Sequence, residues 1–75
     1  MIQKMIEKLE AVNIDKNIKL VIDPAEDVGF YLLVYDLSSG KCIKDHLYDK
    51  DQLDYLYGHA KDIYGVDKKN FYLVS

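Results

Sequence analysis

Two apolar segments joined by a short turn occupy the middle of the chain, where residues 28–48 read VGFYLLVYDLSSGKCIKDHLY. The first segment, Val28 to Asp36, carries aromatic and branched residues on both faces, which is typical of a central strand. Residues 37–40 contain two serines and a glycine, a composition that favours a tight turn. The segment from Lys41 to Tyr48 then predicts an antiparallel partner strand.

The apolar pattern favours one register for this hairpin. Pairing Val34 with Ile43 and Phe30 with Leu47 gathers the aliphatic side chains on one face, whereas a slip of one residue would mix the two sets. This register also sets Asp36 opposite Lys41. It leaves five residues on the other face, namely Tyr31, Leu33, Tyr35, Cys42 and His46.

The segments upstream of the hairpin predict a helix and a first strand. Apolar residues from Ile2 to Val12 recur at helical spacing, which predicts an amphipathic helix over residues 2–12. Alternation over residues 18–22 predicts a strand. We expect Asp23-Pro24 to end it, because proline lacks an N–H and restricts the residue before it.

Downstream of the hairpin, the sequence predicts a second helix. Asp49 is the expected N-cap, with Gln52 at the third helical position completing a capping box, and an apolar stripe runs from Leu53 to Tyr64. Gly65 is placed to end this helix in the left-handed conformation. The last apolar segment, Phe71–Val74, fits either a short edge strand or a segment packed on the core.

These elements together predict a single small α+β domain spanning residues 1–75, with the order α-β-β-β-α. A three-stranded antiparallel meander with two helices packed on one face buries all the apolar stripes, with Phe71–Val74 as an optional fourth edge strand.

Composition excludes several classes of protein. The single cysteine cannot form an internal disulfide, no segment approaches ~20 consecutive apolar residues, and charged residues interrupt the N-terminus where a signal peptide is apolar. We therefore expect a cytoplasmic protein that does not bind a membrane. The ten basic residues are all lysine and the net charge is −3, which disfavours nucleic acid as a partner.

The sequence also offers little for catalysis. Cys42 and His46 would share a strand face, but four residues along a strand separate them by ~13 Å, too far for a nucleophile–base pair or a shared metal. His59 lies beside the apolar stripe of the second helix, and the scattered glycines match no phosphate-binding loop. We expect no enzyme, no catalytic residue, no bound metal and no cofactor.

Acidic residues concentrate in the middle of the chain, since residues 23–54 hold eight acids and three lysines. In an antiparallel meander, the loop after the first strand and the junction after the third lie at the same end of the sheet. Three interpretations are open, namely solvated caps and loops, an acidic docking surface, or a divalent-metal site. The residues expected to converge there are Asp23, Glu26, Asp27, Asp49 and Asp51.

Tyrosine is the other distinctive residue type, with seven in 75 residues. If both helices cover the face with Phe30, Leu32 and Val34, then Tyr31, Leu33 and Tyr35 lie on an uncovered face, where tyrosine is a preferred anchor for protein partners. Cover by the C-terminal segment or plain solvation would equally explain them. Our first hypothesis is a non-catalytic protein-binding module of the accessory, inhibitor, antitoxin or immunity type, and the alternative is a structural homodimer.

The predicted α-β-β-β-α order resembles that of the double-stranded-RNA-binding domain, and the likeness is one of topology. That resemblance implies a basic N-terminus on the second helix, which straddles phosphates. Here the corresponding residues 49–54 read DKDQLD, an acidic segment that would repel RNA.

Overall fold

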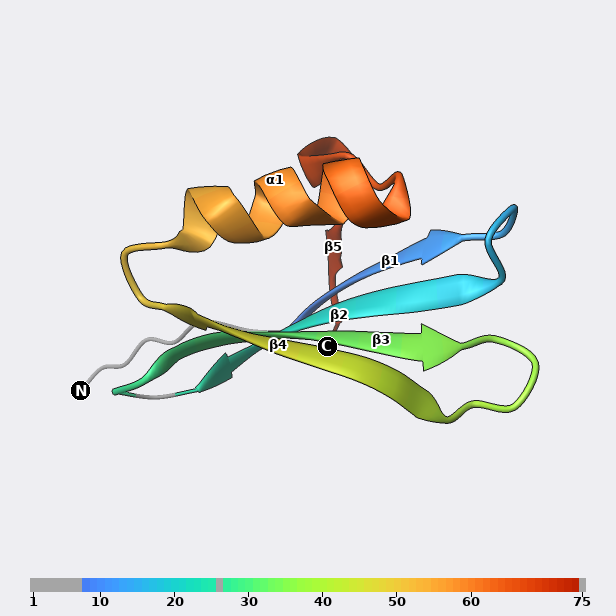
Figure 1. Ribbon diagram of the computed structural model, residues 1–75, viewed down its shortest axis with the longest axis horizontal. Coiled ribbons are helices and arrows are strands. Elements are labelled where there is room, and N and C mark those ends of the chain that lie inside the picture. Colours follow the sequence, from blue (N-terminus) through green and yellow to red (C-terminus); the bar gives the residue numbers. More distant parts are fainter. Residues whose placement is uncertain (1–7, 26, 75) are drawn as a thin grey trace.

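The computed structural model describes residues 8–25 and 27–74, which form a five-stranded antiparallel sheet with one α-helix after the fourth strand (Figure 1). The strands run in the sheet order β4-β3-β2-β1-β5. Their bounds are β1 Leu9–Asn13, β2 Ile18–Ala25, β3 Gly29–Asp36, β4 Cys42–Asp49 and β5 Tyr72–Leu73, with α1 at Leu53–Tyr64 and a 3-10 turn at Lys68–Asn70.

The predicted order α-β-β-β-α is wrong, because the chain follows the order β-β-β-β-α with a single α-helix among the described residues. Residues 9–12 of the expected first helix instead belong to the strand β1, Leu9–Asn13, which pairs with β2 from Leu9↔Ile22 to Asn13↔Ile18. The rest of that expected helix, residues 2–7, lies outside the described residues. Within residues 8–25 and 27–74, one helix packs on the sheet where two were expected.

A short turn explains why a strand forms here instead. Residues 14–17 bring β1 back along β2, closed by a hydrogen bond from the Asn17 amide to the Ile14 carbonyl and by a left-handed Asn17. Leu9 and Ala11 then face the core while Glu10 and Val12 face the other side. The same five residues satisfy a period of two as well as a helical period, so the neighbouring strand decides between them.

β2 extends further than expected, through Pro24 to Ala25, so Asp23-Pro24 does not end it. Pro24 pairs with Phe30 of β3, and the described pairing with β1 begins only at Ile22. Proline is tolerated at such a position because that part of the strand has a single described neighbour.

The β3–β4 hairpin contains a bulge that changes the register along its length. Near the turn the expected register holds, with Tyr35 opposite Cys42 and the Asp36 amide donating to the Lys41 carbonyl. Between Val34 and Tyr35 the register shifts by one residue, so the expected Val34–Ile43 and Phe30–Leu47 pairs do not form. The pairs beyond the shift are Val34↔Lys44, Leu32↔His46 and Phe30↔Tyr48. An extra residue in β4 exchanges its two faces beyond that point.

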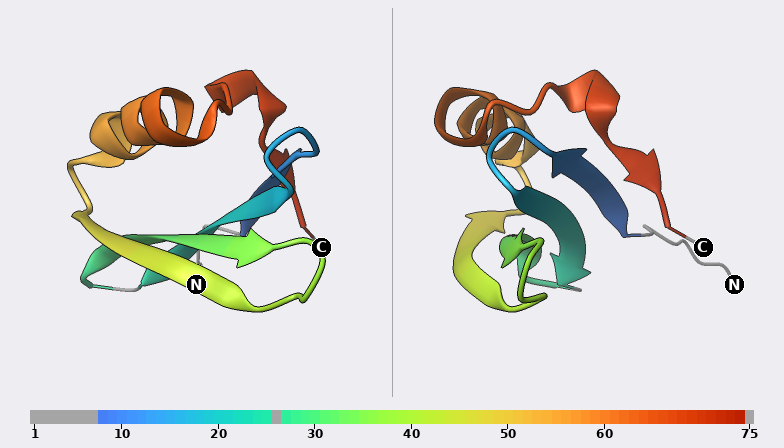
Figure 2. Two further views of the ribbon diagram at one scale, coloured as in Figure 1. Left: turned by 45° about the vertical axis from the view of Figure 1, so that its right-hand side comes forward. Right: turned by 90° about the vertical axis from the view of Figure 1, so that its right-hand side faces the viewer.

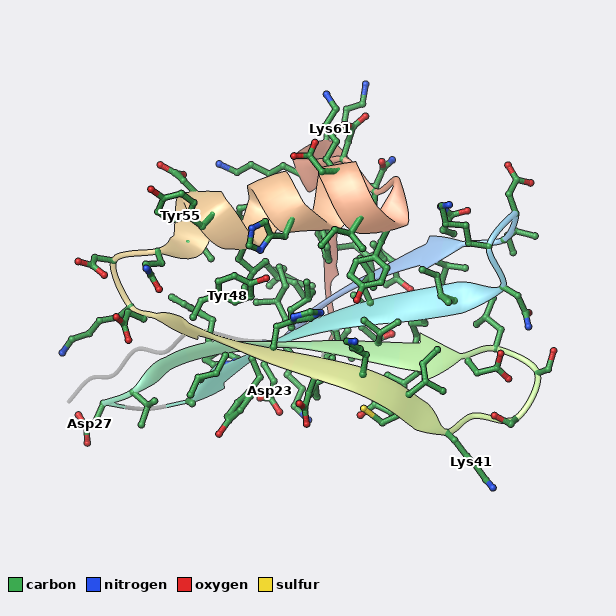
Figure 3. All side chains as sticks on the ribbon, viewed as in Figure 1. Asp23, Asp27, Lys41, Tyr48, Tyr55 and Lys61 are labelled. Carbon is green, nitrogen blue, oxygen red and sulfur yellow. The ribbon has the colours of Figure 1, made fainter. Side chains whose placement is uncertain are left out.

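α1 covers one face of the sheet, and the core lies between them (Figures 1 and 2). Leu56 and Ala60 of the helix are fully buried against Leu20 of β2 and Leu32 of β3. β4 contributes Tyr48, which is 6% exposed and lies between strand and helix in Figure 3.

α1 ends where the sequence predicts but begins later than expected, because Asp49, the expected N-cap, is the last residue of β4. The expected Asp49–Gln52 pair forms a turn before the helix, with the Asp49 amide donating to Gln52 Oε1 over 3.0 Å, and Gln52 itself is the N-cap. Gly65 ends the helix at a φ of 69°, and Val66 beyond it is 2% exposed. Left-handed glycine is the usual stop for a helix.

The C-terminal segment forms the short edge strand that was one of the two expectations. Tyr72 pairs with Glu10 and Leu73 with Leu9, while Phe71 packs edge-on against Tyr57 with their ring centres 5.6 Å apart. The helix therefore carries the chain from β4 at one edge of the sheet to β5 at the other. No helix in the described part of the chain is long and apolar enough to cross a membrane.

Two glycines allow a matched test of this fold. Gly29 has a φ of 150°, and a Cβ on it would overlap the backbone carbonyl of Tyr48, whereas a Cβ on Gly58 in α1 meets nothing within 4 Å. We expect Gly29→Ala to lower the free energy of unfolding by about 2 kcal/mol or more. Gly58→Ala should raise it by about 0.5–1 kcal/mol. Urea unfolding measures both, and equal effects of the two substitutions would contradict the β3–β4 pairing.

Candidate functional site

The sheet has one face under α1 and one turned away from it, which we call the open face. Phe30, Leu32 and Val34 of β3 point under the helix and are buried. Because side chains alternate along a strand, Tyr31, Leu33 and Tyr35 lie on the open face, as expected from the sequence. Figure 3 shows Asp23 of β2 projecting on that side, opposite to Tyr48.

The strand register arranges the open face in three rows across the sheet. The first row holds Leu47, Tyr31 and Asp23, and the middle row holds Asp45, Leu33 and Val21. The third row holds Cys42, Tyr35 and Lys19. The apolar residues therefore form one continuous patch centred on β3.

Exposure within this patch is uneven. Val21 is only 6% exposed yet does not belong to the core cluster under α1, which indicates a small second cluster on the open face. Tyr31 is 39% exposed and Leu47 52%. Leu33 and Tyr35 are half-buried. The patch thus combines packed residues at its centre with accessible aromatic and aliphatic groups around them.

Charged groups on the β1–β2 side of this face pair with one another. Lys8 lies 3.9 Å from Asp23, and Lys19 lies 3.9 Å from Glu10. The Lys19 ammonium also sits 5.3 Å from the centre of the Tyr35 ring, within cation–π range. These partly exposed ion pairs stabilise the fold little. They leave the β3–β4 side of the face as its apolar part.

The expected acidic residues gather only in part. Asp27 in the β2–β3 turn, Asp49 at the end of β4 and Asp51 two residues later lie at the same end of the sheet, and all three are exposed. Asp23 lies on the open face and not in the loop, because β2 continues past it. Glu26 lies outside the described residues. The described part of the chain contains no group of three or more potential metal ligands.

Two histidines and two tyrosines between β4 and α1 form contacts that the sequence did not predict. Tyr48 of β4 bonds through its hydroxyl to His59 Nδ1 of α1 over 2.7 Å. His46 Nε2 of β4 lies 2.9 Å from the Tyr64 hydroxyl of α1. Each element thus supplies one histidine and one tyrosine. The bulge is the cause, because without it His46 and Tyr48 would point to opposite sides from those observed.

This arrangement overturns the expectation that Cys42 and His46 share a face. Cys42 lies before the bulge and pairs with Tyr35, whereas His46 lies beyond it and faces the helix. The exposed Cys42 thiol donates to the Lys44 carbonyl over 3.4 Å. Both histidines contact phenol hydroxyls, and Cys42 lies on the opposite face of the sheet from His46.

Burial raises the pKa values of three tyrosines near the contact between the sheet and α1. Burial, followed by the neighbouring Tyr64 phenol, raises the pKa of Tyr48 above its ordinary value, and burial raises the pKa of Tyr57 and Tyr64 as well. Desolvation disfavours the phenolate, so the neutral phenol is the form that the fold accommodates.

This predicts a loss of stability in alkaline solution. In the unfolded chain these phenols ionise near pH 10, below their folded pKa, so the unfolded state loses protons first as pH rises. The free energy of unfolding should be steady at neutral pH and fall as pH rises from about 9 through the folded pKa. Tyr48→Phe should reduce that slope in urea unfolding measured from pH 7 to pH 11. A slope unchanged by this substitution would contradict the prediction.

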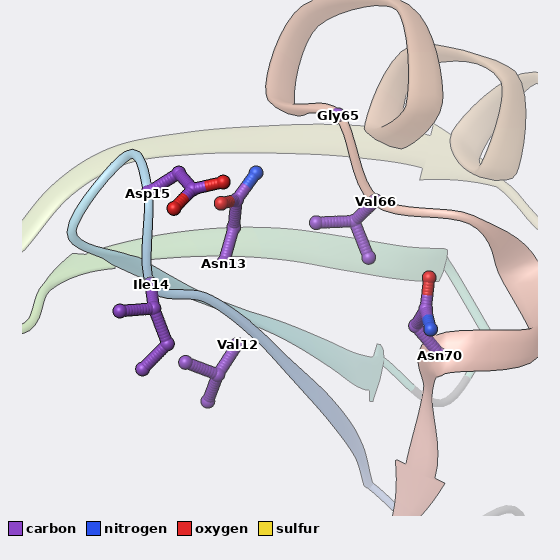
Figure 4. A pocket seen from close by; sticks show the side chains of 7 residues that line it. All are labelled: Val12, Asn13, Ile14, Asp15, Gly65, Val66 and Asn70. Carbon is purple, nitrogen blue, oxygen red and sulfur yellow. The ribbon is translucent and has the colours of Figure 1, made fainter.

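A shallow hollow lies between the β1–β2 turn and the end of α1 (Figure 4). Its volume is about 270 Å³, and the lining residues are Val12, Asn13, Ile14, Asp15, Gly65, Val66 and Asn70. Asn13 donates to the Tyr64 carbonyl over 2.8 Å and accepts from the Lys16 amide, and Asn70 accepts from the Asp67 amide. The side-chain amides of Asn13 and Asn70 thus connect the loops around the hollow. We therefore assign the hollow a structural role.

Comparisons with known proteins add no functional assignment to this geometry. No family model matches the chain, and neither the curated proteins nor the solved structures contain a significant match to it. The open face is therefore the candidate site on its physical properties alone.

Proposed function

We propose that this chain is a small non-catalytic protein-binding module that acts through the open face. The observation that carries this proposal is that residues 8–25 and 27–74 place their helix on one face of the sheet only. α1 and the 3-10 turn both lie on one side of the sheet (Figure 1). The apolar patch around Tyr31, Leu33, Tyr35 and Leu47 lies on the opposite face, because the alternate residues of β3 are buried under α1. Contiguous accessible apolar surface of this kind marks interaction sites in soluble proteins.

The position of Tyr31 and Tyr35 on a central strand favours high affinity for a partner. Tyr31 and Tyr35 stand on β3, which is hydrogen-bonded to β2 on one side and β4 on the other. A side chain on a strand held from both sides loses little freedom when a partner binds, and tyrosine has only two rotatable side-chain torsions to order. Large aromatic groups near the centre of a patch are the usual energetic hot spots.

The acidic end supports a role in orienting the partner. Asp27, Asp49 and Asp51 lie beside one end of the apolar patch and do not fill it. Charges at the rim of an interface raise the association rate with an oppositely charged surface and fix its orientation more than they add affinity. The favoured partner surface is therefore apolar at its centre and basic at one end.

The proposed compartment is the cytoplasm. Cys42 is a free and exposed thiol, and a reducing compartment keeps such a group from forming intermolecular disulfides.

Crosslinking from the patch tests the proposed function. A photo-reactive amino acid at position 31 should capture a defined binding partner in cells, and the mass of the product identifies it. The same group at Tyr55, which is 65% exposed on α1, is the matched control and should not capture that partner.

Binding of the identified partner then gives the quantitative readout. We expect Tyr31→Ser with Tyr35→Ser to weaken binding at least about 30-fold, the scale of losing a hot spot. Tyr55→Ser should leave it unchanged, and circular dichroism confirms that each variant is folded. Equal capture from positions 31 and 55, or binding indifferent to the double substitution, would remove the proposal.

A further inference from the structure

We infer that the partner on the open face is a second copy of this chain, packed sheet against sheet about a two-fold axis that crosses the strands. This inference rests on the proposed function and names its partner. The axis lies between the two sheets along the middle row of the open face, Asp45–Leu33–Val21. The product is a four-layer assembly of helix, sheet, sheet and helix, with both helices outside.

The apolar patch is complementary to itself about this row. Tyr31 and Tyr35 lie two residues on either side of Leu33, so the axis places Tyr31 of one copy over Tyr35 of the other and the two Leu33 side chains together. On β4, Leu47 lies on the corresponding side of Asp45 and meets the Cys42 end of the second copy. Two sheets packed in this way lie ~10 Å apart, a spacing that such side chains fill.

Charge placement selects this axis over the alternative that runs along the strands. The chosen axis brings each end of one sheet over the opposite end of the other, so Asp49 faces Lys41 and Asp23 faces Lys19, each twice by symmetry. Figure 3 shows Asp27 and Lys41 at opposite ends of the sheet, both projecting away from α1. An axis along the strands would instead set the acidic end against itself, which like charges disfavour.

The lysine end remains available for this contact. Asp36, the last residue of β3, accepts hydrogen bonds from the Ser39 amide over 2.8 Å and from Asn17 Nδ2 over 3.2 Å. Its carboxylate is therefore engaged by its own turn and by the neighbouring β1–β2 turn, while Lys41 is exposed.

The area of the open face limits the affinity that we expect for the dimer. Four strands ~4.8 Å apart and up to eight residues long project roughly 500 Å². This is below the ~800 Å² per partner of a standard interface. The sheet also curves around α1, as the right-hand view of Figure 2 shows, which concentrates contact on the inner strands. We therefore expect a dimer that exchanges with monomer at micromolar concentrations.

One group opposes the association. Asp45 lies on the axis row, so the two copies bring their Asp45 carboxylates toward each other at the β4 edge. Among the described residues no cation lies within ion-pair distance of Asp45, as the three observed pairs involve other acids. Removing this charge should strengthen the dimer, whereas a different partner with a cation facing Asp45 would bind less tightly after the same change.

The test is a charge exchange measured by analytical ultracentrifugation from micromolar to millimolar protein. We expect the native chain to pass from monomer to dimer, and Lys41→Glu and Asp49→Lys each to shift the midpoint at least about tenfold toward monomer, on the scale of 1.4 kcal/mol. An equimolar mixture of the two variants should dimerise again, because each then meets the opposite charge. Asp62→Lys and Lys69→Glu, both exposed on the helix side, are the matched controls and should leave the midpoint unchanged.

Asp45→Asn provides an independent measurement. This variant should dimerise at lower protein concentration than the native chain. A native chain that stays monomeric at millimolar concentration overturns the dimer, as does a mixture that fails to recombine or an Asp45→Asn variant that dimerises less. These results leave the proposed function standing if crosslinking from position 31 captures a different protein. Both proposals fail together only if that crosslink captures neither a second copy nor another partner.

Discussion

The shift of register between Val34 and Tyr35 is the constraint on which the layered structure depends. It gives β4 one residue more than its partner, so the side chains beyond the shift exchange faces. His46 and Tyr48 thereby reach Tyr64 and His59 on α1, while Leu47 joins the open face. A single backbone irregularity thus supplies both the polar contacts that hold the helix to the edge of the sheet and part of the apolar patch on the opposite side.

The sheet is covered unequally as a result of chain length and order. After β4 the chain has one helix, and that helix must both bury the sheet's larger apolar face and carry the chain across to β5. A domain of this size buries a smaller share of its surface than a larger one. Among the residues that the structure describes, the second apolar face, around Val21 and Leu33, is packed only by its neighbours in the sheet. This unequal cover is the physical basis for interpreting the open face as a binding surface.

Local patterns in the sequence predicted most of the interior correctly. The alternation in β2, the doubly apolar β3 and the stripe of α1 are each long enough for one period to dominate, and Gly65 has a definite stereochemical role. The placement of Tyr31, Leu33 and Tyr35 on the uncovered face followed from the same alternation. These features depend on residues close together in the chain.

The errors arose where distant segments decide the outcome. Leu9–Asn13 fits both a helical and a strand period, and the pairing with β2 and β5 determines which one forms. The bulge likewise adds one residue to β4, and no glycine or proline marks its position in the sequence. The contacts between the histidines and tyrosines therefore could not be predicted from the sequence pattern. Asp23 moved from loop to sheet face for a related reason, since pairing with β3 carries β2 through Pro24.

The joining of the two ends of the described chain has a mechanical consequence. The Val74 amide donates to the Lys8 carbonyl over 3.0 Å, next to the two-residue pairing of β5 with β1. Tension applied between these ends would therefore break the hydrogen bonds between β5 and β1 one after another. It would not load several of them at the same time. Once β5 has peeled away, the load passes to α1 and its contacts with β4, while the four-stranded meander stays intact. Under force, the pairing of β5 with β1 should therefore break before the rest of the structure unfolds.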